Sequence, residues 1–206
     1  MLQTLVSKRC GAWLGASVTA LMVAMPSHAM VVLDTFGPGD TSPGLNWSLY
    51  NQDANNGQFL AVPFNLAGAA TVDSVLSSIN GIGNYQIGVV AGAGLPSGAF
   101  VYSTSVTNPS ANLLLSSLGW TLGAGDYWLV SKGDLGSSGT WQGGGQLGTS
   151  AWAFTFGPND ANWNFTGTDD APAARIMASA VPEPASLALM LGGLALVGGL
   201  ARSRRG

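Results

Sequence analysis

Few side chains in this sequence of 206 residues carry groups that could catalyse a reaction or bind a metal. The only histidine is His28 and the only cysteine is Cys10. Cleavage after Ala29, which we predict below, removes both. A Ser-His-Asp triad, a cysteine nucleophile, a disulfide, and a zinc or copper site with imidazole or thiolate ligands are then excluded. The remaining candidates are oxygen ligands for a metal and carboxylates for catalysis.

Two short motifs could use such groups. Residues 143–148 fit G-x-G-x-x-G, but a polar loop precedes them and a strand follows, whereas a dinucleotide site needs the strand first and a helix afterwards. Residues 51–57 place oxygen atoms at alternating positions, as calcium loops do, but lack a second carboxylate and the late glutamate. We therefore favour a hairpin loop and a solvated turn, and we predict no cofactor and no metal.

The acidic residues do not form a convincing catalytic pair. Asp169 and Asp170 are adjacent, so in an extended chain they point to opposite faces. Two more distant aspartates could serve a glycoside hydrolase, which is the third of three hypotheses for function. We predict that the protein is not an enzyme.

Six tryptophans follow Ala29, and exposed indole rings can stack on sugars. Trp120 and Trp128 lie in apolar segments, so we expect both to be buried. Trp141 and Trp163 have loop-like surroundings, in SSGTWQGGG and NDANWNF, and we expect both to be exposed. A carbohydrate-binding module that uses Trp141 and Trp163 is therefore the alternative hypothesis.

The charge between Met30 and Ala180 limits the possible partners. Nine aspartates in this segment stand against only Lys132 and Arg175, a formal balance of −7. Two cations cannot form a basic patch, so we predict no binding to nucleic acid or to anionic lipid.

The same segment predicts an all-β fold, a jelly-roll-like β-sandwich. Short runs of β-branched and aromatic residues alternate with Gly, Pro, Asn and Asp, and no long linker divides them. About 150 residues are enough to bury one core. Pro63 suggests an edge or a bulge in its strand. The expected strands cover residues 31–36, 58–66, 71–79, 85–91, 100–106, 113–122, 126–132, 150–156 and 174–180.

The N-terminus has the features of a signal peptide. Lys8 and Arg9 precede the apolar stretch 10–23, and Ser27-His28-Ala29 supplies small residues where a signal peptidase cleaves. We predict a signal peptide over residues 1–29, cleaved between Ala29 and Met30. An uncleaved N-terminal helix is the alternative.

The C-terminus has the features of a short membrane anchor. Residues 185–201 are 17 residues without a charge, and as a helix they would extend about 26 Å, slightly less than the roughly 30 Å of bilayer hydrocarbon. The prolines of 181–184 favour extended chain before this helix. The arginines of 202–206 favour the cytoplasmic side, which places the body on the other side. A plain anchor and a buried core helix are the alternatives.

This tail resembles the PEP-CTERM sorting signal of Gram-negative bacteria. The resemblance rests on Val181-Pro182-Glu183-Pro184, on the Gly-rich span, and on the basic end, in the required order. It implies that an exosortase in the inner membrane reads the tail, cleaves near the motif, and passes the protein to the surface, often in species that make exopolysaccharide. The residues that it assigns are the sorting motif Pro182, Glu183 and Pro184 and the basic tail Arg202, Arg204 and Arg205.

The body is similar to the extracellular domain called choice-of-anchor R, over about Leu33 to Ala180. This resemblance implies a surface domain and assigns no catalytic residue. Its motifs are LDTFGPGD (33–40), FLAVPF (59–64), GDYWLV (125–130), TWQGG (140–144) and APAARI (171–176).

Three segments and one leading function follow. Residues 1–29 are the signal peptide, 30–180 the extracellular domain, and 181–206 the sorting signal. We expect a surface or extracellular-matrix protein, associated with exopolysaccharide or biofilm. Its expected partners are signal peptidase, exosortase and exopolysaccharide, with an intermediate in the inner membrane before processing.

Overall fold

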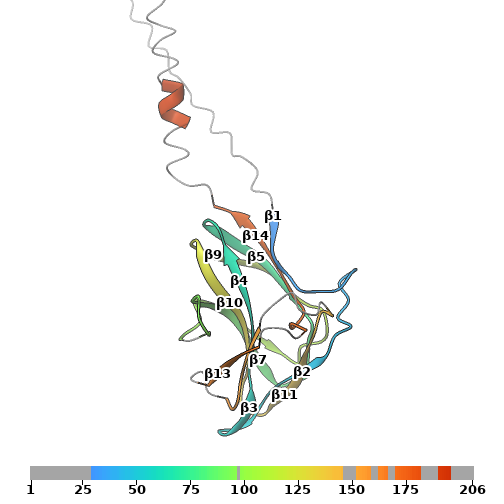
Figure 1. The fold of residues 1–206 in the computed structure, drawn as a ribbon. Helices are drawn as coiled ribbons and strands as arrows, with labels where there is room; N and C mark the ends of the chain where they lie inside the picture. The colour runs from blue at the N-terminus through green and yellow to red at the C-terminus, as the bar shows by residue number, and fades with distance from the viewer. Residues whose placement is uncertain are drawn as a thin grey trace, which may run out of the picture.

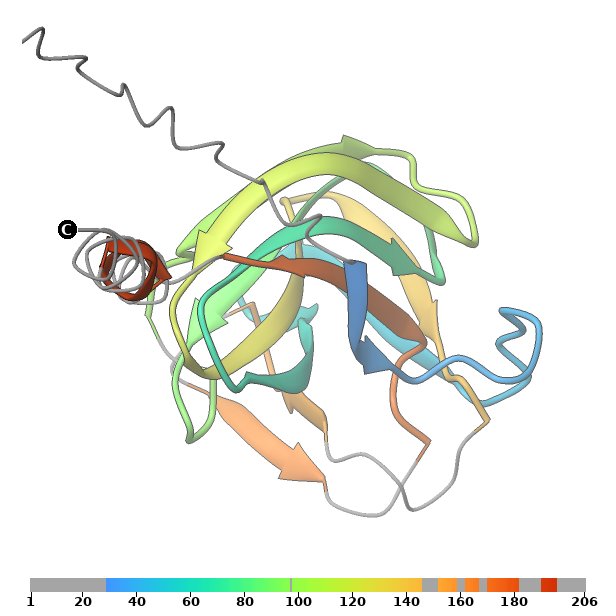
Figure 2. The same cartoon turned by 90° about the horizontal axis from the view of Figure 1, so that it is seen from above.

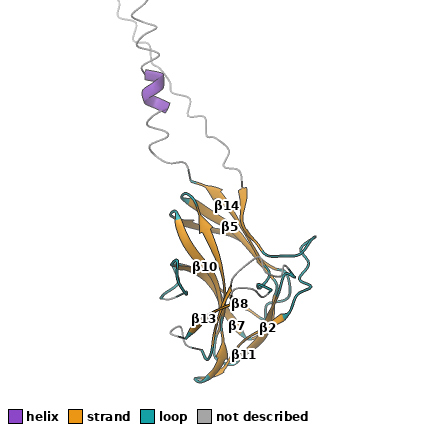
Figure 3. Ribbon diagram, viewed as in Figure 1, coloured by secondary structure: helices purple, strands orange, loops and turns teal. Residues whose placement is uncertain are grey.

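A computed structural model of the chain describes residues 29–96, 98–145, 152–158, 162–166, 170–181 and 190–195. The described residues form fourteen β-strands, and helical backbone occurs among them only at 190–195. Figures 1 and 3 show a body built of strands joined by loops. The all-β class predicted from the sequence is confirmed.

The strands form three sheets, in which every pairing between neighbours is antiparallel. The first sheet has the order β1 (Ala29–Asp34), β14 (Ala174–Ala180), β5 (Ala70–Ser77) and β9 (Leu113–Leu122). The second has the order β13 (Trp163–Thr166), β12 (Trp152–Thr155), β4 (Leu60–Leu66), β10 (Gly125–Gly133), β7 (Asn84–Ala91) and β8 (Tyr102–Thr107). The third has the order β3 (Asn56–Gln58), β2 (Asn46–Asp53), β11 (Ser137–Gln142) and β6 (Ile79–Ile82).

The two four-stranded sheets are linked by continuous chain. Only Ser78 separates β5 from β6, and a bridge between Gly143 and Pro172 joins the end of β11 to the chain before β14. Buried residues of all three sheets pack into one main core, including Leu49, Leu129 and Ile176. The three sheets therefore share one core, and the view from above in Figure 2 shows strands curving around the centre of the body.

Two strands of the six-stranded sheet are buried on both faces over part of their length. In β4, Leu60, Val62, Phe64 and Leu66 alternate into the main core, while Ala61 faces the other way. The strand β10 behaves in the same way. The outward residues form a second, smaller cluster, against which Phe100 packs from the connection between β7 and β8. Burial on both faces explains why these segments read as nearly continuous apolar runs. The second cluster consists of Phe59, Ala61, Val90, Trp128, Val130, Ala153 and Trp163.

Pro63 lies in an interior strand, because β4 has β12 on one side and β10 on the other. However, β12 pairs with β4 only at Leu60 and Ala61. The missing N–H of Pro63 therefore costs no bond on the β12 side, which is the physical reason that a proline is tolerated here.

Several strand predictions were wrong in detail. The expected single strand 71–79 is divided at Ser78 into β5 and β6, which belong to different sheets. The strand β13 was not predicted, and β3 overlaps the expected strand 58–66 only at Gln58. The strands β2 and β11 were also not predicted, because their Ser, Gly, Asn and Gln residues are typical of loops. Long-range pairing made them strands in spite of their low β-propensity, since β11 lies between β2 and β6.

The predicted helix 185–201 lies mostly outside the described residues. Its described part, 190–195, is helical and exposed. In the part of the chain that the structure describes, no helix is both long enough and apolar enough to cross a membrane.

Candidate functional site at the end of β14

The folded body ends at Val181, directly after β14. This strand lies between β1 and β5, and its last residue, Ala180, is opposite Ala70 in β5. The N–H of Val181 still donates to the carbonyl oxygen of Ala69, at 3.0 Å. The next residue is Pro182, which has no backbone N–H and cannot extend the ladder. The sequence thus ends the sheet at the position where the predicted sorting motif begins.

The predicted leader junction lies beside this exit. Ala29 and Met30 begin β1 and are opposite Ser179 and Ala178 of β14. Both junction residues are exposed. Figure 1 shows the start of β1 and the end of β14 at the same end of the body. The predicted leader junction and the end of β14, where the body ends, are therefore neighbours in space.

Polar contacts fix β14 on both sides. The Ser179 hydroxyl donates to Asp73 Oδ2 at 2.5 Å. On the other side Arg175 donates to Asp34 Oδ2 at 2.9 Å and to Asp40 Oδ1 at 2.6 Å. These two hydrogen bonds, the bond to Asp40 first, raise the pKa of the Arg175 guanidinium above its ordinary value. The three side chains are partly exposed, so the ion pairs add only about 0–1 kcal/mol each to stability.

A buried carboxylate organises the chain just before β14. Asp170 is only 1% exposed. Its Oδ2 accepts a hydrogen bond from the N–H of Leu45 at 2.8 Å, and its Oδ1 accepts one from the N–H of Gly145 at 2.6 Å. A Cβ added at Gly44 or Gly143 would overlap the carboxylate, which explains glycine at both positions. One side chain thus joins two loops that lie far apart in the sequence.

The following residues are held in the same manner. The Thr35 hydroxyl donates to the carbonyl oxygen of Pro172 at 2.7 Å and accepts from the N–H of Ala174 at 2.8 Å. The indole N–H of Trp141 donates to the carbonyl oxygen of Ala173 at 2.8 Å. We name residues 35–37, 44–45, 141–145 and 170–174 together the Asp170 junction.

The Asp170 junction brings together three of the five motifs quoted above for the body. These are residues 33–40, 140–144 and 171–176. The other two motifs, 59–64 and 125–130, pair with each other through β4 and β10. The motifs therefore mark the packing of the body, and none of them provides an open cluster of reactive groups.

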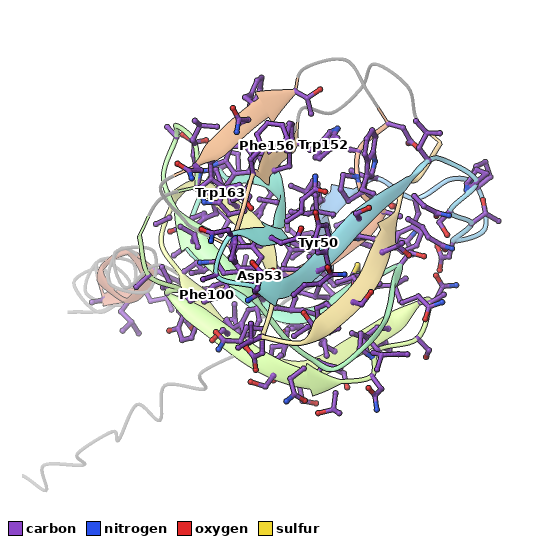
Figure 4. All side chains as sticks on the ribbon, turned by 90° about the horizontal axis from the view of Figure 1, so that it is seen from below. Tyr50, Asp53, Phe100, Trp152, Phe156 and Trp163 are labelled. Carbon is purple, nitrogen blue, oxygen red and sulfur yellow. The ribbon has the colours of Figure 1, made fainter. Side chains whose placement is uncertain are left out.

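The expectation that Trp141 and Trp163 are exposed is wrong. Trp141 is 0% exposed and belongs to the main core, and Trp163 is 7% exposed and belongs to the second cluster. Their loop-like neighbours concealed that they lie in strands β11 and β13. The two rings share no face and are not available to stack on a sugar. Figure 4 labels Trp163 together with Trp152, Phe156 and Phe100.

Two exposed aromatic rings, one just after β12 and one in β13, belong to phenylalanines that we did not single out from the sequence. Phe156 is 68% exposed and Phe165 is 58% exposed. Trp152, Phe154 and Phe156 alternate along one face from the core to the surface, in ring contact with each other. The sequence shows that these aromatic residues alternate with a period of two, but it does not show at which residue the chain leaves the core.

The other motifs have structural explanations where they are described. Residues 51–57 form the hairpin between β2 and β3, in which the N–H of Asn55 donates to Asp53 Oδ1 at 2.8 Å. The segment is thus a hairpin turn whose residues 52–56 are exposed. Across the described residues, no three His, Cys, Asp or Glu side chains come close enough to hold a metal. Asp169 and Gly148 lie outside the described residues.

The residues assigned to the tail lie outside the described part of the chain. They are Pro182, Glu183, Pro184, Arg202, Arg204 and Arg205. The structure therefore gives the point at which the tail leaves the body, and the tail itself is recognised from its sequence.

Comparison with known families identifies the tail. Residues 180–205 match the family described as the PEP-CTERM protein-sorting motif. A search of curated proteins gave no significant match. The chain thus carries a PEP-CTERM sorting motif, which marks an exported protein that an exosortase processes and that reaches the cell surface through a membrane-anchored intermediate. The match begins at Ala180, the last residue of β14.

Proposed function

We propose that this protein displays the β domain 30–180 on the outside of a Gram-negative cell, in a surface layer or matrix associated with exopolysaccharide or biofilm. Signal peptidase removes residues 1–29, and exosortase acts on 181–206. One observation supports this proposal above the others: the matched sorting segment begins at the last residue of the central strand β14. Removal of the chain beyond Val181 therefore takes no strand from the body.

The arrangement of the two ends supports the same proposal. Ala29 is opposite Ser179, so the leader and the tail leave the body side by side. Both enzymes would act at one end of the body, and its remaining surface would stay free for contacts outside the cell. We propose that the domain is a jelly-roll-like sandwich that acts by binding and not by catalysis, because the exported segment carries neither histidine nor cysteine.

Replacing Pro182, Glu183 and Pro184 by alanine is expected to leave export intact and to trap the protein in the inner membrane. The leader alone starts export, and the motif is read only afterwards. Membrane fractionation in a bacterium that has the exosortase measures retention, and protease added outside the inner membrane tests the location of the body.

The matched control removes one exposed proline and one exposed acid from the body, as Pro38→Ala with Asp134→Ala, and should be sorted normally. Normal release of the motif variant would refute sorting through these residues. Loss of export in both variants would instead indicate a folding defect.

A further inference from the structure

A groove of about 280 Å³ lies where β4 and β10 meet the connection after β7, and its lining includes Phe64 and Tyr127 of the main core. Pro63 and Asn65 of β4 and Asp126 and Trp128 of β10 alternate outward here, and each β4 residue is directly opposite its β10 partner. The connection after β7, at Gly92 and Ala93, forms a side wall.

The wall is held against the sheet by two hydrogen bonds. The N–H of Gly92 donates to the carbonyl oxygen of Asp126 at 2.9 Å, and the indole N–H of Trp128 donates to the carbonyl oxygen of Gly94 at 2.7 Å. Gly92 has φ +144°, a conformation that side-chain-bearing residues rarely adopt. The groove is therefore formed by backbone that is hydrogen-bonded to the sheet.

One end of the groove is polar and pre-arranged. The Asn65 side-chain amide donates to Asp126 Oδ1 at 2.7 Å and more weakly to the carbonyl oxygen of Gly125 at 3.3 Å. Among the described residues, the other oxygens, Asp126 Oδ2 and Asn65 Oδ1, have no hydrogen-bond partner. Both side chains are exposed. The hydrogen bond joins the two side chains, and each keeps one oxygen that can accept a donor.

The charge of the groove limits the ligand. Asp126 forms no ion pair with any described residue, and the segment 30–180 has nine aspartates against two cations. An anionic ligand, such as a uronic acid, would be repelled. A single carboxylate with one amide is too few ligands for a calcium ion. Hydroxyl groups are donors that suit these two acceptor oxygens.

The rest of the groove is apolar and small. Pro63 is half-buried and Ala93 is exposed, so both offer apolar surface, whereas Trp128 is 3% exposed and supports the floor from below. The volume is below the about 300–1,000 Å³ typical of sites for drug-sized ligands. A pyranose ring has this combination of properties, because one edge carries hydroxyl groups and one face carries C–H groups.

We propose that this groove binds one neutral pyranose residue of a polysaccharide. Asp126 and Asn65 accept hydrogen bonds from adjacent hydroxyl groups, and Pro63 and Ala93 contact the C–H face of the ring. The inference deepens the proposed function, on which it rests for the ligand, because it gives the domain a way to hold exopolysaccharide. It also replaces the buried Trp141 and Trp163 as the sugar-contacting residues.

Saturation-transfer NMR on the purified full chain tests the proposal. The micelle should be made of an amine-oxide detergent, because detergents with sugar head groups would compete. The probes are the methyl pyranosides of glucose, galactose and mannose, and dextran. At least one probe should receive saturation, most strongly at the C–H protons of one ring face. Asp126→Ala should weaken binding about tenfold or more, since it removes a hydrogen bond to a charged group.

Two further variants separate the site from a general effect. Ala93→Leu leaves the charge unchanged but fills the groove, and should also abolish saturation. Asp134→Ala removes an exposed aspartate just after the other end of β10 and should bind as the wild type does. Circular dichroism confirms that each variant is folded.

Absence of saturation for every probe, or equal binding by Asp126→Ala and wild type, would overturn the sugar site. Binding is measured on purified protein and sorting by fractionation. The sugar site can therefore fail while the proposed surface function stands, and the reverse can also occur.

Discussion

Asp170→Ala is expected to lower the free energy of unfolding by about 3 kcal/mol. The variant leaves the N–H groups of Leu45 and Gly145 without their acceptor. A hydrogen bond to a charged group contributes about 1.5–3 kcal/mol, and relief from burying the carboxylate offsets part of the loss of two such bonds. Urea denaturation of the full chain, followed by tryptophan fluorescence, measures the difference.

Two companion variants sharpen this measurement. Asp134→Ala removes an exposed carboxylate and should change stability by less than about 0.5 kcal/mol. Asp170→Asn keeps the shape of the side chain but has only one acceptor oxygen. Its loss of unfolding free energy should therefore lie between those of Asp170→Ala and Asp134→Ala. Equal stability of Asp170→Ala and Asp134→Ala would mean that the buried carboxylate does not hold the loops together.

The effect of Asp170→Ala should be local at first. Its hydrogen bonds join the loop before β2 to the loop after β11, and both loops precede or follow strands of the third sheet. Hydrogen exchange should therefore accelerate at Leu45 and Gly145 before it accelerates in β10, whose residues Leu129 and Val130 are fully buried.

A chain that ends at Val181 is expected to keep a folded, protease-resistant body, whereas a chain that ends at Ala173 should not fold. The shorter chain lacks β14, which is paired on both sides in the first sheet. It also loses Ile176, which is fully buried, and exposes the facing edges of β1 and β5. Loss of a buried Ile side chain alone costs about 2–5 kcal/mol, and whole domains have only about 5–15 kcal/mol.

Both truncated chains keep the leader, so both should be exported, and both lack the sorting motif. Digestion with proteinase K measures their folding without any contribution from sorting. The chain 1–181 should be resistant and the chain 1–173 should be degraded. Rapid digestion of 1–181 would show that the body needs its tail to fold, and resistance of 1–173 would show that β14 is not an integral strand.

These two chains also bear on processing. If 1–181 is folded and 1–173 is not, cleavage on the tail side of Val181 preserves the body, and cleavage within β14 would destroy it. The sequence of the tail and the architecture of the sheet then agree on where the domain ends.

The sequence by itself determined the features that depend on local order. The tail could be recognised, and the leader could be predicted, because charge, apolar length and proline position follow one another along a short stretch of chain, and membranes and processing enzymes read them in that form. The all-β class was predictable for the same reason. Strands such as β4 and β10 lie in runs rich in aliphatic and aromatic residues bounded by turn-forming residues.

The tertiary structure decided everything that depends on long-range partners. The strand β11 is rich in Ser and Gly, and it became a strand, with Trp141 buried, only because β2 and β6 lie on either side of it. From the sequence, Asp170 was only one of two adjacent aspartates that make a poor catalytic pair, and its role depends on loops that are distant in sequence. The pairing of Ala29 with Ser179 and the groove at Asn65 and Asp126 depend in the same way on register between strands. The amino-acid composition along the chain does not show which strands pair with each other, because strand pairing depends on how the whole chain buries a common core.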